Sequence, residues 1–215
     1  MNAINFPVIQ AANVAARWHA AQRRKGAAQE PYINHLLEVA ALVAAAGGDQ
    51  QAIIAALLHD AIEDQKISAE TIAEQFSEHV ARMVLEVTDD KSLSRETRKA
   101  AQIATAGHKS HSAKLIKLAD KISNVRSVAT SPPFKWSQQR RRDYIEFCAA
   151  VVNELRGTSA LLEAKFDAAR AIALLSVSKP EDLPVFVPLE TADQLRARIK
   201  RMYPDLTDEQ IEAFM

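Results

Sequence analysis

Several things that this sequence lacks exclude whole classes of protein. Its one cysteine, Cys148, cannot form an internal disulfide, which suits a reducing compartment. Lys+Arg and Asp+Glu both number 27, so no overall field attracts nucleic acid or a membrane surface, and affinity for a polyanion must come from local basic clusters. Neither a signal peptide nor an apolar run of about 18 residues is present. We therefore expect a soluble cytoplasmic protein that binds neither nucleic acid nor membrane.

Glycine and aromatic residues are also scarce. The 215 residues include 5 glycines and 6% aromatics, whereas 48% are hydrophobic. This composition favours helices, and we find no convincing strand, internal repeat, P-loop or GxGxxG motif. The sequence predicts an all-α protein that is long enough to bury a sizeable core.

Hydrophobic periodicity and capping residues place the helices. One is expected over 11–24, one over 113–128, and one that continues without a break after Asp49 through His59 to Asp64. A polar, exposed helix is expected over 94–105. The candidate N-caps are Asn34, Asp49, Ser68, Ser77, Ser137 and Ser159.

The composition changes near residue 178. Pro180, Pro184 and Pro188 indicate an extended linker over 179–190. Two capping boxes, Thr191–Gln194 and Thr207–Gln210, each predict a short helix. We expect residues 1–178 to form the main domain and residues 191–215 a short C-terminal helical extension.

The stretch Leu57–Asp64 carries the most informative group of polar residues. On a continuous helix Glu63 would follow His59, and Asp64 would follow Asp60, at a spacing of four residues. Burying these groups costs several kcal/mol unless something pairs them, and a divalent metal would do so. The alternative is a chance His–Asp pair at a solvated helix end.

Further candidate ligands decide between these interpretations. His35 opens a helix after Pro31, and Asp120 lies within an apolar helix, where it must pair with a nearby lysine or with a metal. Together with His59 and Asp60 they supply two imidazoles and two carboxylates from three helices. Such mixed N and O ligation suits Mn, Fe or Zn better than Ca.

Two basic clusters have open roles. Arg23, Arg24 and Lys25, followed by Gly26, either stabilise the negative end of a helix or capture phosphate. The run 140–142 places three arginines at a helix start, where they oppose the macrodipole. At least one of them is expected to serve a purpose other than helix stability.

The motifs as a set resemble a known family. Five segments resemble, in order and spacing, the motifs of the hydrolase domain of the RelA/SpoT family. They are Arg24–Lys25, Pro31–His35, Leu58–Asp64, Val87–Lys91 and Lys117–Arg126. The resemblance extends over roughly 11–175 and is strongest to the small, single-domain alarmone hydrolases of the metazoan SpoT homologue type. It implies an all-α HD-domain helical bundle and Mn²⁺ as cofactor. It also implies hydrolysis of the 3′-pyrophosphate of guanosine tetra- and pentaphosphate, (p)ppGpp.

The same resemblance implies residue roles. The residues that match the metal ligands are His35, His59, Asp60 and Asp120, and those that match the catalytic acidic pair are Glu63 and Asp64. The residues that match substrate contacts are Arg24, Lys25, Asn124, Arg140 and Tyr144. Two positions depart from the family pattern, Leu36 in place of Pro and Ser127 in place of Thr, and neither removes a ligand.

Other functions compete with alarmone hydrolysis. An HD-type phosphohydrolase could instead act on (p)ppApp or on the 2′-phosphate of NADPH, and a degenerate HD domain could merely bind nucleotide. The intact pair Glu63 and Asp64 argues against the latter. A synthetase domain after residue 180 has no room in this chain. The expected partner is a small nucleotide, and homo-oligomerisation is left open.

Overall fold

The computed structural model describes residues 6–178, 196–197, 200–201 and 207–208. Within 6–178 the chain forms helices α1 (Phe6–Trp18), α2 (Ile33–Ala45), α3 (Gln50–Leu58), α4 (Ala61–Gln65), α5 (Ala69–Gln75), α6 (Glu78–Val87), α7 (Arg95–Ala106), α8 (His111–Thr130), α9 (Gln138–Asn153) and α10 (Ala160–Ser176). No strand occurs among the described residues, where only isolated bridges join Arg23 to Pro31 and Gly26 to Pro133. The all-α expectation is confirmed.

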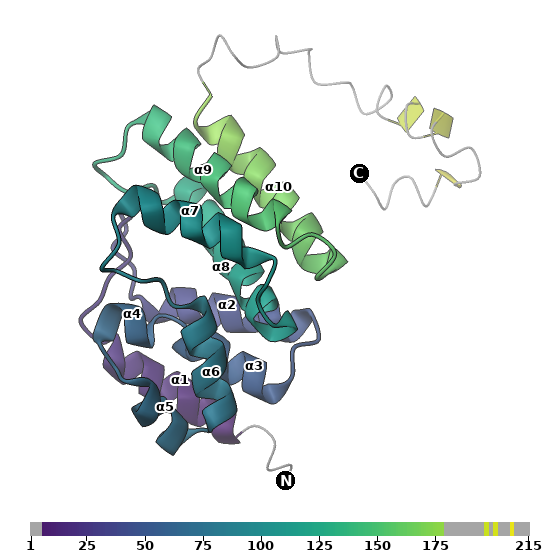
Figure 1. Ribbon diagram of the computed structural model, residues 1–215. Coiled ribbons are helices and arrows are strands. Elements are labelled where there is room, and N and C mark those ends of the chain that lie inside the picture. Colours follow the sequence, from purple (N-terminus) through teal and green to yellow (C-terminus); the bar gives the residue numbers. More distant parts are fainter. Residues whose placement is uncertain (1–5, 179–195, 198–199, 202–206, 209–215) are drawn as a thin grey trace. The chain divides into compact units, whose positions relative to one another are not determined.

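Helix α8 is the centre of the bundle. It packs against α2, α3 and α6 on one side and against α9 and α10 on the other, as the labelled helices in Figure 1 show. Its residues Ile116 and Ile122 are completely buried, and its polar residue Asp120 is only 8% exposed. Because α8 contacts both groups of helices, its polar residues can meet side chains from both.

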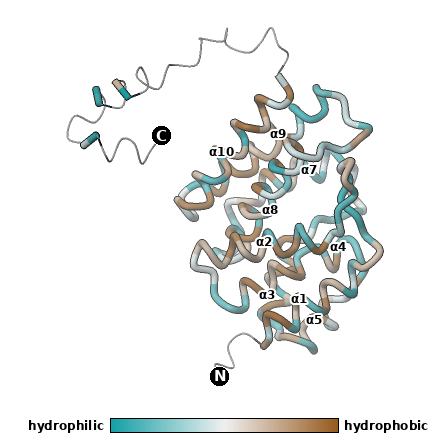
Figure 2. The backbone as a smooth tube through the Cα atoms, turned by 180° about the vertical axis from the view of Figure 1, so that it is seen from behind, coloured by the Kyte–Doolittle hydropathy of each residue, from teal (hydrophilic) through white to brown (hydrophobic). Residues whose placement is uncertain are grey.

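The core explains why the short helices are stable. Hydrophobic residues run along α2, α3 and α10 (Figure 2), and Leu36, Leu58 and Phe166 are almost completely buried. Each such side chain contributes about 1.5–3 kcal/mol when it leaves water. Leu36, which departs from the family pattern, is thus a core residue.

Side-chain caps set most of the helix starts. The Asp49 carboxylate accepts a hydrogen bond from the amide of Ala52, and serine hydroxyls do the same at six later helices. Each cap satisfies an amide that the helix leaves without a partner, worth about 1 kcal/mol. The predicted caps Asp49, Ser68, Ser77, Ser137 and Ser159 are confirmed.

Two helix starts and ends differ from the sequence expectation. The first helix ends at Trp18 instead of residue 24, so Arg24 and Lys25 lie in the loop before α2. The predicted cap Asn34 is wrong, because Tyr32 already has helical backbone angles and occupies the N-cap position. Pro31 fixes the chain in a turn there, and its carbonyl accepts from the amide of Asn34.

The third helix does not continue through the His59–Asp60 pair, contrary to expectation. It ends at Leu58, and α4 begins at Ala61 after a non-helical Asp60 with φ −99° and ψ 0°. The Ala56 carbonyl, which a continuous helix would offer to the amide of residue 60, accepts from Nδ1 of His59 at 2.8 Å. Because of this break, Glu63 and Asp64 lie on the short helix α4 and not on the helix that leads to His59, although all three residues line the same cavity.

The contacts of the chain divide into two units, Met1–Val177 and Ser178–Met215. The predicted linker 179–190 lies outside the described residues, and so do both capping boxes except for Thr207 and Asp208. None of the described helices is long and apolar enough to cross a membrane.

Candidate metal centre and active site

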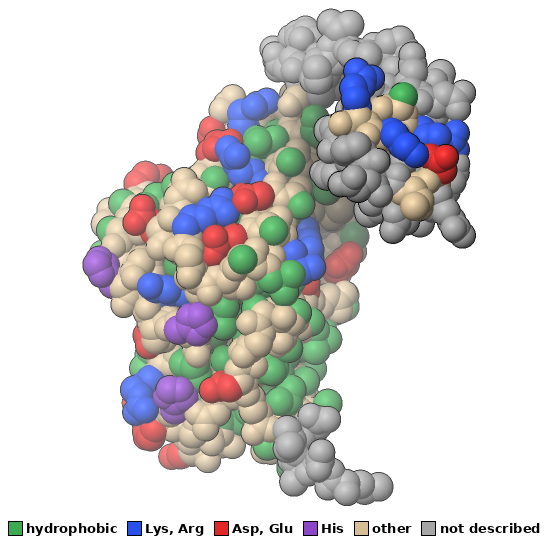
Figure 3. All heavy atoms as spheres, turned by 90° about the vertical axis from the view of Figure 1, so that its right-hand side faces the viewer, with side chains coloured by type: hydrophobic (Ala, Val, Ile, Leu, Met, Phe, Trp, Pro, Cys, Tyr) green, Lys and Arg blue, Asp and Glu red, His purple; other side chains and the backbone are tan. Residues whose placement is uncertain are grey.

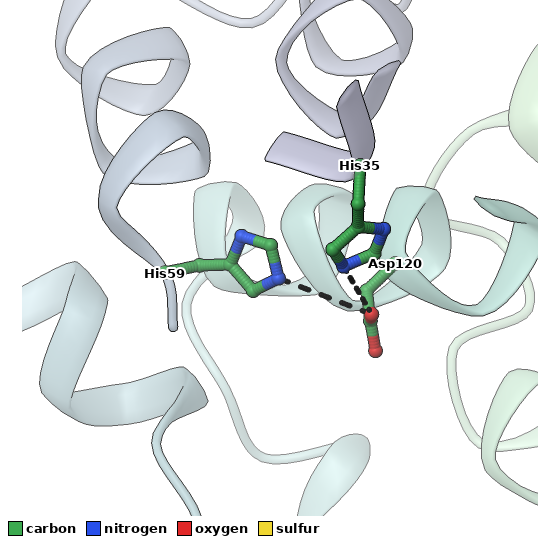
Figure 4. Close-up of side chains that lie close together, drawn as sticks. All are labelled: His35, His59 and Asp120. Atoms are coloured by element: carbon green, nitrogen blue, oxygen red, sulfur yellow. Dashed lines mark ion pairs between the residues drawn. The ribbon is translucent and has the colours of Figure 1, made fainter. Parts of the chain in front are cut away.

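Two imidazoles and a carboxylate from three parts of the chain meet at one buried point. His35 comes from the first turn of α2, His59 from the end of α3 and Asp120 from the middle of α8 (Figure 4). The ligand atoms of these three residues all lie within 4.8 Å of one another. His35 Nε2 lies 3.4 Å from Asp120 Oδ1, and His59 Nε2 lies 3.9 Å from the same oxygen.

The fourth predicted ligand lies beside this group. Asp60 Oδ2 is 3.2 Å from Nε2 of His59 and 3.7 Å from Nε2 of His35. The break between α3 and α4 brings Asp60 to the same side as His59, although the two residues are adjacent in the sequence. The structure thus brings together all four residues that the sequence analysis selected as ligands.

The donor atoms fit a divalent cation. Among the described residues His59 Nε2 is buried and makes no hydrogen bond, although Asp60 Oδ2 lies 3.2 Å away, and this is costly unless another group satisfies it. Burial lowers the pKa of His35 and keeps its imidazole neutral, as ligation requires. Burial disfavours the charge on Asp120, yet the Lys121 ammonium, His35 and His59 together outweigh burial and hold the pKa of Asp120 well below its usual range. Burial disfavours the charge on His59, but the Asp60 and Asp120 carboxylates outweigh burial and raise the pKa of His59 to about 9, so a bound metal would displace a proton from this ring. Two imidazoles and two carboxylates are a suitable set for a divalent metal.

Neighbouring side chains hold the two carboxylates in place. Lys121 Nζ lies 3.0 Å from Asp120 Oδ2, and Asn124 Nδ2 donates to Asp120 Oδ1 at 2.6 Å. Tyr32 donates from its hydroxyl to Asp60 Oδ2 at 2.7 Å. The two alternatives for Asp120 are therefore compatible, because the lysine and His35 approach different oxygens.

The predicted acidic pair lies on α4 beside the cluster. Asp64 accepts from Gln22 Nε2 at 2.8 Å and from Lys91 Nζ at 2.7 Å, so both of its oxygens have donors. The Glu63 carboxylate accepts a longer bond, 3.3 Å from the amide of Asp89, and its other oxygen lies 3.5 Å from Lys91 Nζ. Burial and the negative charge of Asp89 raise the pKa of Glu63.

These groups open into one cavity of about 490 Å³. His59, Asp60 and Asp120 reach it, and so does the acidic pair. The predicted substrate contacts also line it, namely Arg24, Lys25, Asn124, Arg140 and Tyr144. Arg24 donates to Asn124 Oδ1 at 3.0 Å and thereby connects to the Asp120 carboxylate.

The sequence analysis missed a second basic side of this cavity. Arg95, Arg98 and Lys99 of α7 line it, and none of them is among the predicted substrate contacts. Lys117 of α8 also lines it, with only 7% of its surface exposed. Their spacing of three and four residues places the α7 side chains on one helix face. The spacing of these basic residues is visible in the sequence, but it lies in the helix over 94–105 that we expected to be exposed.

One face of the main domain carries mixed charge. In Figure 3 its basic and acidic side chains are interspersed, without one large patch of a single sign, and its hydrophobic side chains gather beside them. This agrees with the formal net charge of zero. Basic residues that line the cavity are thus a local feature.

The fold and the buried His/Asp cluster define an HD domain, and the family model described as HD domain matches residues 11–145. The chain therefore belongs to the HD-domain family.

Comparison with particular proteins narrows the family further. The guanosine-3′,5′-bis(diphosphate) 3′-pyrophosphohydrolase MESH1 of Xenopus tropicalis is 45% identical over 162 residues, which cover 74% of this chain and 90% of that protein. The Homo sapiens protein of the same name is 42% identical over 158 residues, covering 73% and 88%. A solved structure, described as a metazoan ortholog of SpoT that hydrolyses ppGpp and plays a role in starvation responses, has a TM-score of 0.75 and 40% identity and covers 79% of this chain and 96% of that one. The resemblance to the metazoan type of small alarmone hydrolase is confirmed.

Proposed function

We propose that this protein is an enzyme that hydrolyses the 3′-pyrophosphate of guanosine 3′,5′-bis(diphosphate) and of the pentaphosphate, giving GDP or GTP and pyrophosphate. In the overall reaction water adds to the phosphorus bonded to ribose O3′, the P–O3′ bond breaks, and O3′ takes up a proton. The observation that carries the proposal is the cluster of His35, His59, Asp60 and Asp120 beside an acidic pair in a basic cavity. Identity above 40% to enzymes named for this reaction supports the choice of substrate.

The four clustered residues are the proposed ligands of a divalent ion, and Mn²⁺ is the proposed cofactor because two imidazoles disfavour the harder Mg²⁺. Such an ion would neutralise charge on the phosphoryl oxygens and lower the pKa of a water molecule bound to it. The protein contributes the buried, charged surroundings that hold the ligands. Tyr32, Lys121 and Asn124 restrict the two carboxylates through the contacts described above.

Within the acidic pair, Glu63 is the better candidate for the general base. Asp64 already accepts hydrogen bonds on both oxygens, from Gln22 and Lys91, so both oxygens are engaged. Glu63 has fewer donors and a raised pKa, and both properties favour proton uptake from water. We assign to Asp64 the role of holding Lys91 and the water in position.

The raised pKa of Glu63 predicts a pH dependence. The base acts only when ionised, so the rate should rise with pH as Glu63 loses its proton. Asp89→Asn removes a negative charge that raises the pKa of Glu63, so the acidic limb of the kcat/KM profile should move to lower pH. The control is Asp90→Asn, since Asp90 is exposed and bonds to Ser92. An acidic limb that stays in place in Asp89→Asn, or moves equally in Asp90→Asn, would contradict the assignment.

The two basic sides of the cavity suit a nucleotide with two polyphosphate groups. On one side are Lys25, in the loop before α2, and Arg140, in the first turn of α9. On the other side are Arg95 and Arg98 of α7. We assign both sides to neutralising phosphate charge. Arg140 also stacks 4.8 Å above Trp136, which fixes its guanidinium at the cavity.

Lys25→Ala should chiefly raise KM, by roughly tenfold, because a hydrogen bond to a charged group contributes about 1.5–3 kcal/mol and phosphate charge is already present in the ground state. Lys25 is preferable to Arg24 for this test, since Arg24 also bonds to Asn124. Steady-state kinetics with ppGpp would measure kcat and KM for this variant and for Lys165→Ala on α10, which does not line the cavity. A fall in kcat with unchanged KM would contradict a ground-state role.

The experiment that tests the function is product analysis. The purified full chain with Mn²⁺ should convert ppGpp to GDP and pyrophosphate in equal amounts. Parallel reactions with ppApp and with NADPH would identify the competing activities, because NADPH would release single phosphate. Failure to release pyrophosphate from ppGpp by protein that holds its metal would refute the proposal.

A further inference from the structure

Behind His35, on the side away from the cavity, four side chains form a continuous chain of hydrogen bonds. His35 Nδ1 lies 2.8 Å from Ser123 Oγ, and Ser123 donates from this hydroxyl to Glu38 Oε2 at 2.6 Å. Arg126 donates to the other Glu38 oxygen at 2.8 Å. His35 and Glu38 are three residues apart on α2, and Ser123 and Arg126 are three apart on α8, so the chain joins facing sides of two packed helices.

The chemistry of these groups fixes where the protons lie. A carboxylate only accepts hydrogen bonds, so the single hydroxyl proton of Ser123 is directed to Glu38. The Ser123 oxygen must then accept from His35, which places the one ring proton of the neutral imidazole on Nδ1. Nε2 is left with its lone pair toward Asp60 and Asp120, as ligation of a metal requires.

The second histidine is fixed by a different means. His59 directs its Nδ1 to the Ala56 carbonyl, a backbone group of its own helix. Within the described part of the chain, the partner of His35 Nδ1 is not a backbone group but the side chain of Ser123, which is 2% exposed. Therefore a backbone carbonyl sets the tautomer of His59, whereas side chains that substitution can remove set the tautomer of His35.

We propose that Glu38 and Ser123 are positioning residues that hold His35 in its metal-binding tautomer, with Arg126 fixing the Glu38 carboxylate. This inference rests on the proposed function in that the cluster holds a divalent metal. Neither Glu38 nor Ser123 lines the main cavity, so neither touches substrate. They border a separate cavity of about 200 Å³.

The test is a titration of the full chain with Mn²⁺, in which electron paramagnetic resonance measures the free ion. Ser123→Ala and Glu38→Ala should each weaken Mn²⁺ binding by about 10- to 100-fold, the usual effect of removing an outer partner of a metal-ligating histidine. The double variant should be little worse than the weaker-binding single variant, because both substitutions break the same chain.

Two controls separate this role from simpler effects. Glu30→Ala removes a negative charge from the rim of the same small cavity without touching Ser123, so it reports the effect of charge alone. Ser176→Ala removes a hydroxyl that donates to a helix carbonyl on α10, away from the cluster. Both controls should bind Mn²⁺ like the wild type.

A second readout follows the proton itself. Nitrogen-15 NMR of the metal-free proteins should show the His35 proton on Nδ1 in the wild type and a mixture of the two tautomers in the Glu38→Ala variant. Three results would each overturn the relay, meaning the chain of hydrogen bonds from His35 through Ser123 to Glu38, and leave the metal centre standing. They are wild-type Mn²⁺ affinity in Ser123→Ala and Glu38→Ala, losses that add in the double variant, and a loss in Glu30→Ala equal to that in Glu38→Ala. Absence of Mn²⁺ binding by the wild type would overturn both the relay and the proposed metal centre.

Discussion

Removal of the metal is expected to abolish hydrolysis of ppGpp, and Mn²⁺ should restore it better than Mg²⁺. The reason is the donor set, in which His35 and His59 supply imidazole nitrogen beside the carboxylates of Asp60 and Asp120. Mg²⁺ prefers oxygen ligands and retains its water, so it gains less from this site. Pyrophosphate release after exhaustive chelation, and after addition of each ion, would measure the difference. Full activity in metal-free protein would contradict the mechanism.

The dependence on a metal can also be tested by substituting one of the proposed ligands. His59→Ala removes the buried nitrogen that has no hydrogen-bond partner, so it should reduce metal content and activity by more than the about 10- to 100-fold that an outer partner contributes. His108→Ala is the matched control, because His108 is exposed in the turn after α7. Metal analysis of both variants gives the outcome independently of catalysis. Equal metal content in His59→Ala and His108→Ala would exclude His59 as a ligand.

Local signals in the sequence predicted much of the fold. Ser68, Ser77 and Ser159 were recognised as caps because a short hydroxyl side chain before an apolar run can satisfy a free helix amide. Asn34 failed by the same rule, since Pro31 begins the turn earlier and the chain is already helical at Tyr32. A cap is therefore predictable only when nothing upstream has already set the backbone.

The break between α3 and α4 was not predictable from periodicity. The apolar pattern continues from α3 into Ala61 and Ile62, and the turn is marked by features of the folded chain, the hydrogen bond from His59 to the Ala56 carbonyl and the non-helical backbone of Asp60. The ligand residues were nevertheless found, because residue type and the resemblance to a family do not depend on a continuous helix. The sequence identified which residues meet, and the tertiary fold determined how.

The residues that were missed share a different cause. Arg95, Arg98 and Lys99 lie on a polar helix, and polar helices are usually solvated on all free faces. The packing of α7 against α9 turns this face to the cavity. The relay through Ser123 and Glu38 likewise depends on α2 meeting α8, a contact that no local pattern encodes.

Glu63→Gln is expected to lower kcat by about 10²–10⁴ with little change in KM, since a general base acts mainly in the transition state. The substitution retains the shape of the side chain and removes its charge, and it does not alter any of the four proposed ligands. Asp64→Asn should also lower kcat, because the amide loses the charged contact with Lys91 and no longer holds Lys91 and the water in position. Both variants should retain metal and bind nucleotide.

The two variants should differ in how they respond to pH. In Glu63→Gln the acidic limb that the raised pKa of Glu63 produces should disappear, whereas Asp64→Asn should retain it at a lower rate. Glu74→Gln on the exposed side of α5 provides the matched control and should retain both kcat and the limb. If Glu63→Gln keeps the wild-type rate with metal bound, water activation belongs to another group. If instead Asp64→Asn loses the limb and Glu63→Gln keeps it, the two carboxylates exchange roles, and Asp64 must release Gln22 or Lys91 before it can take a proton.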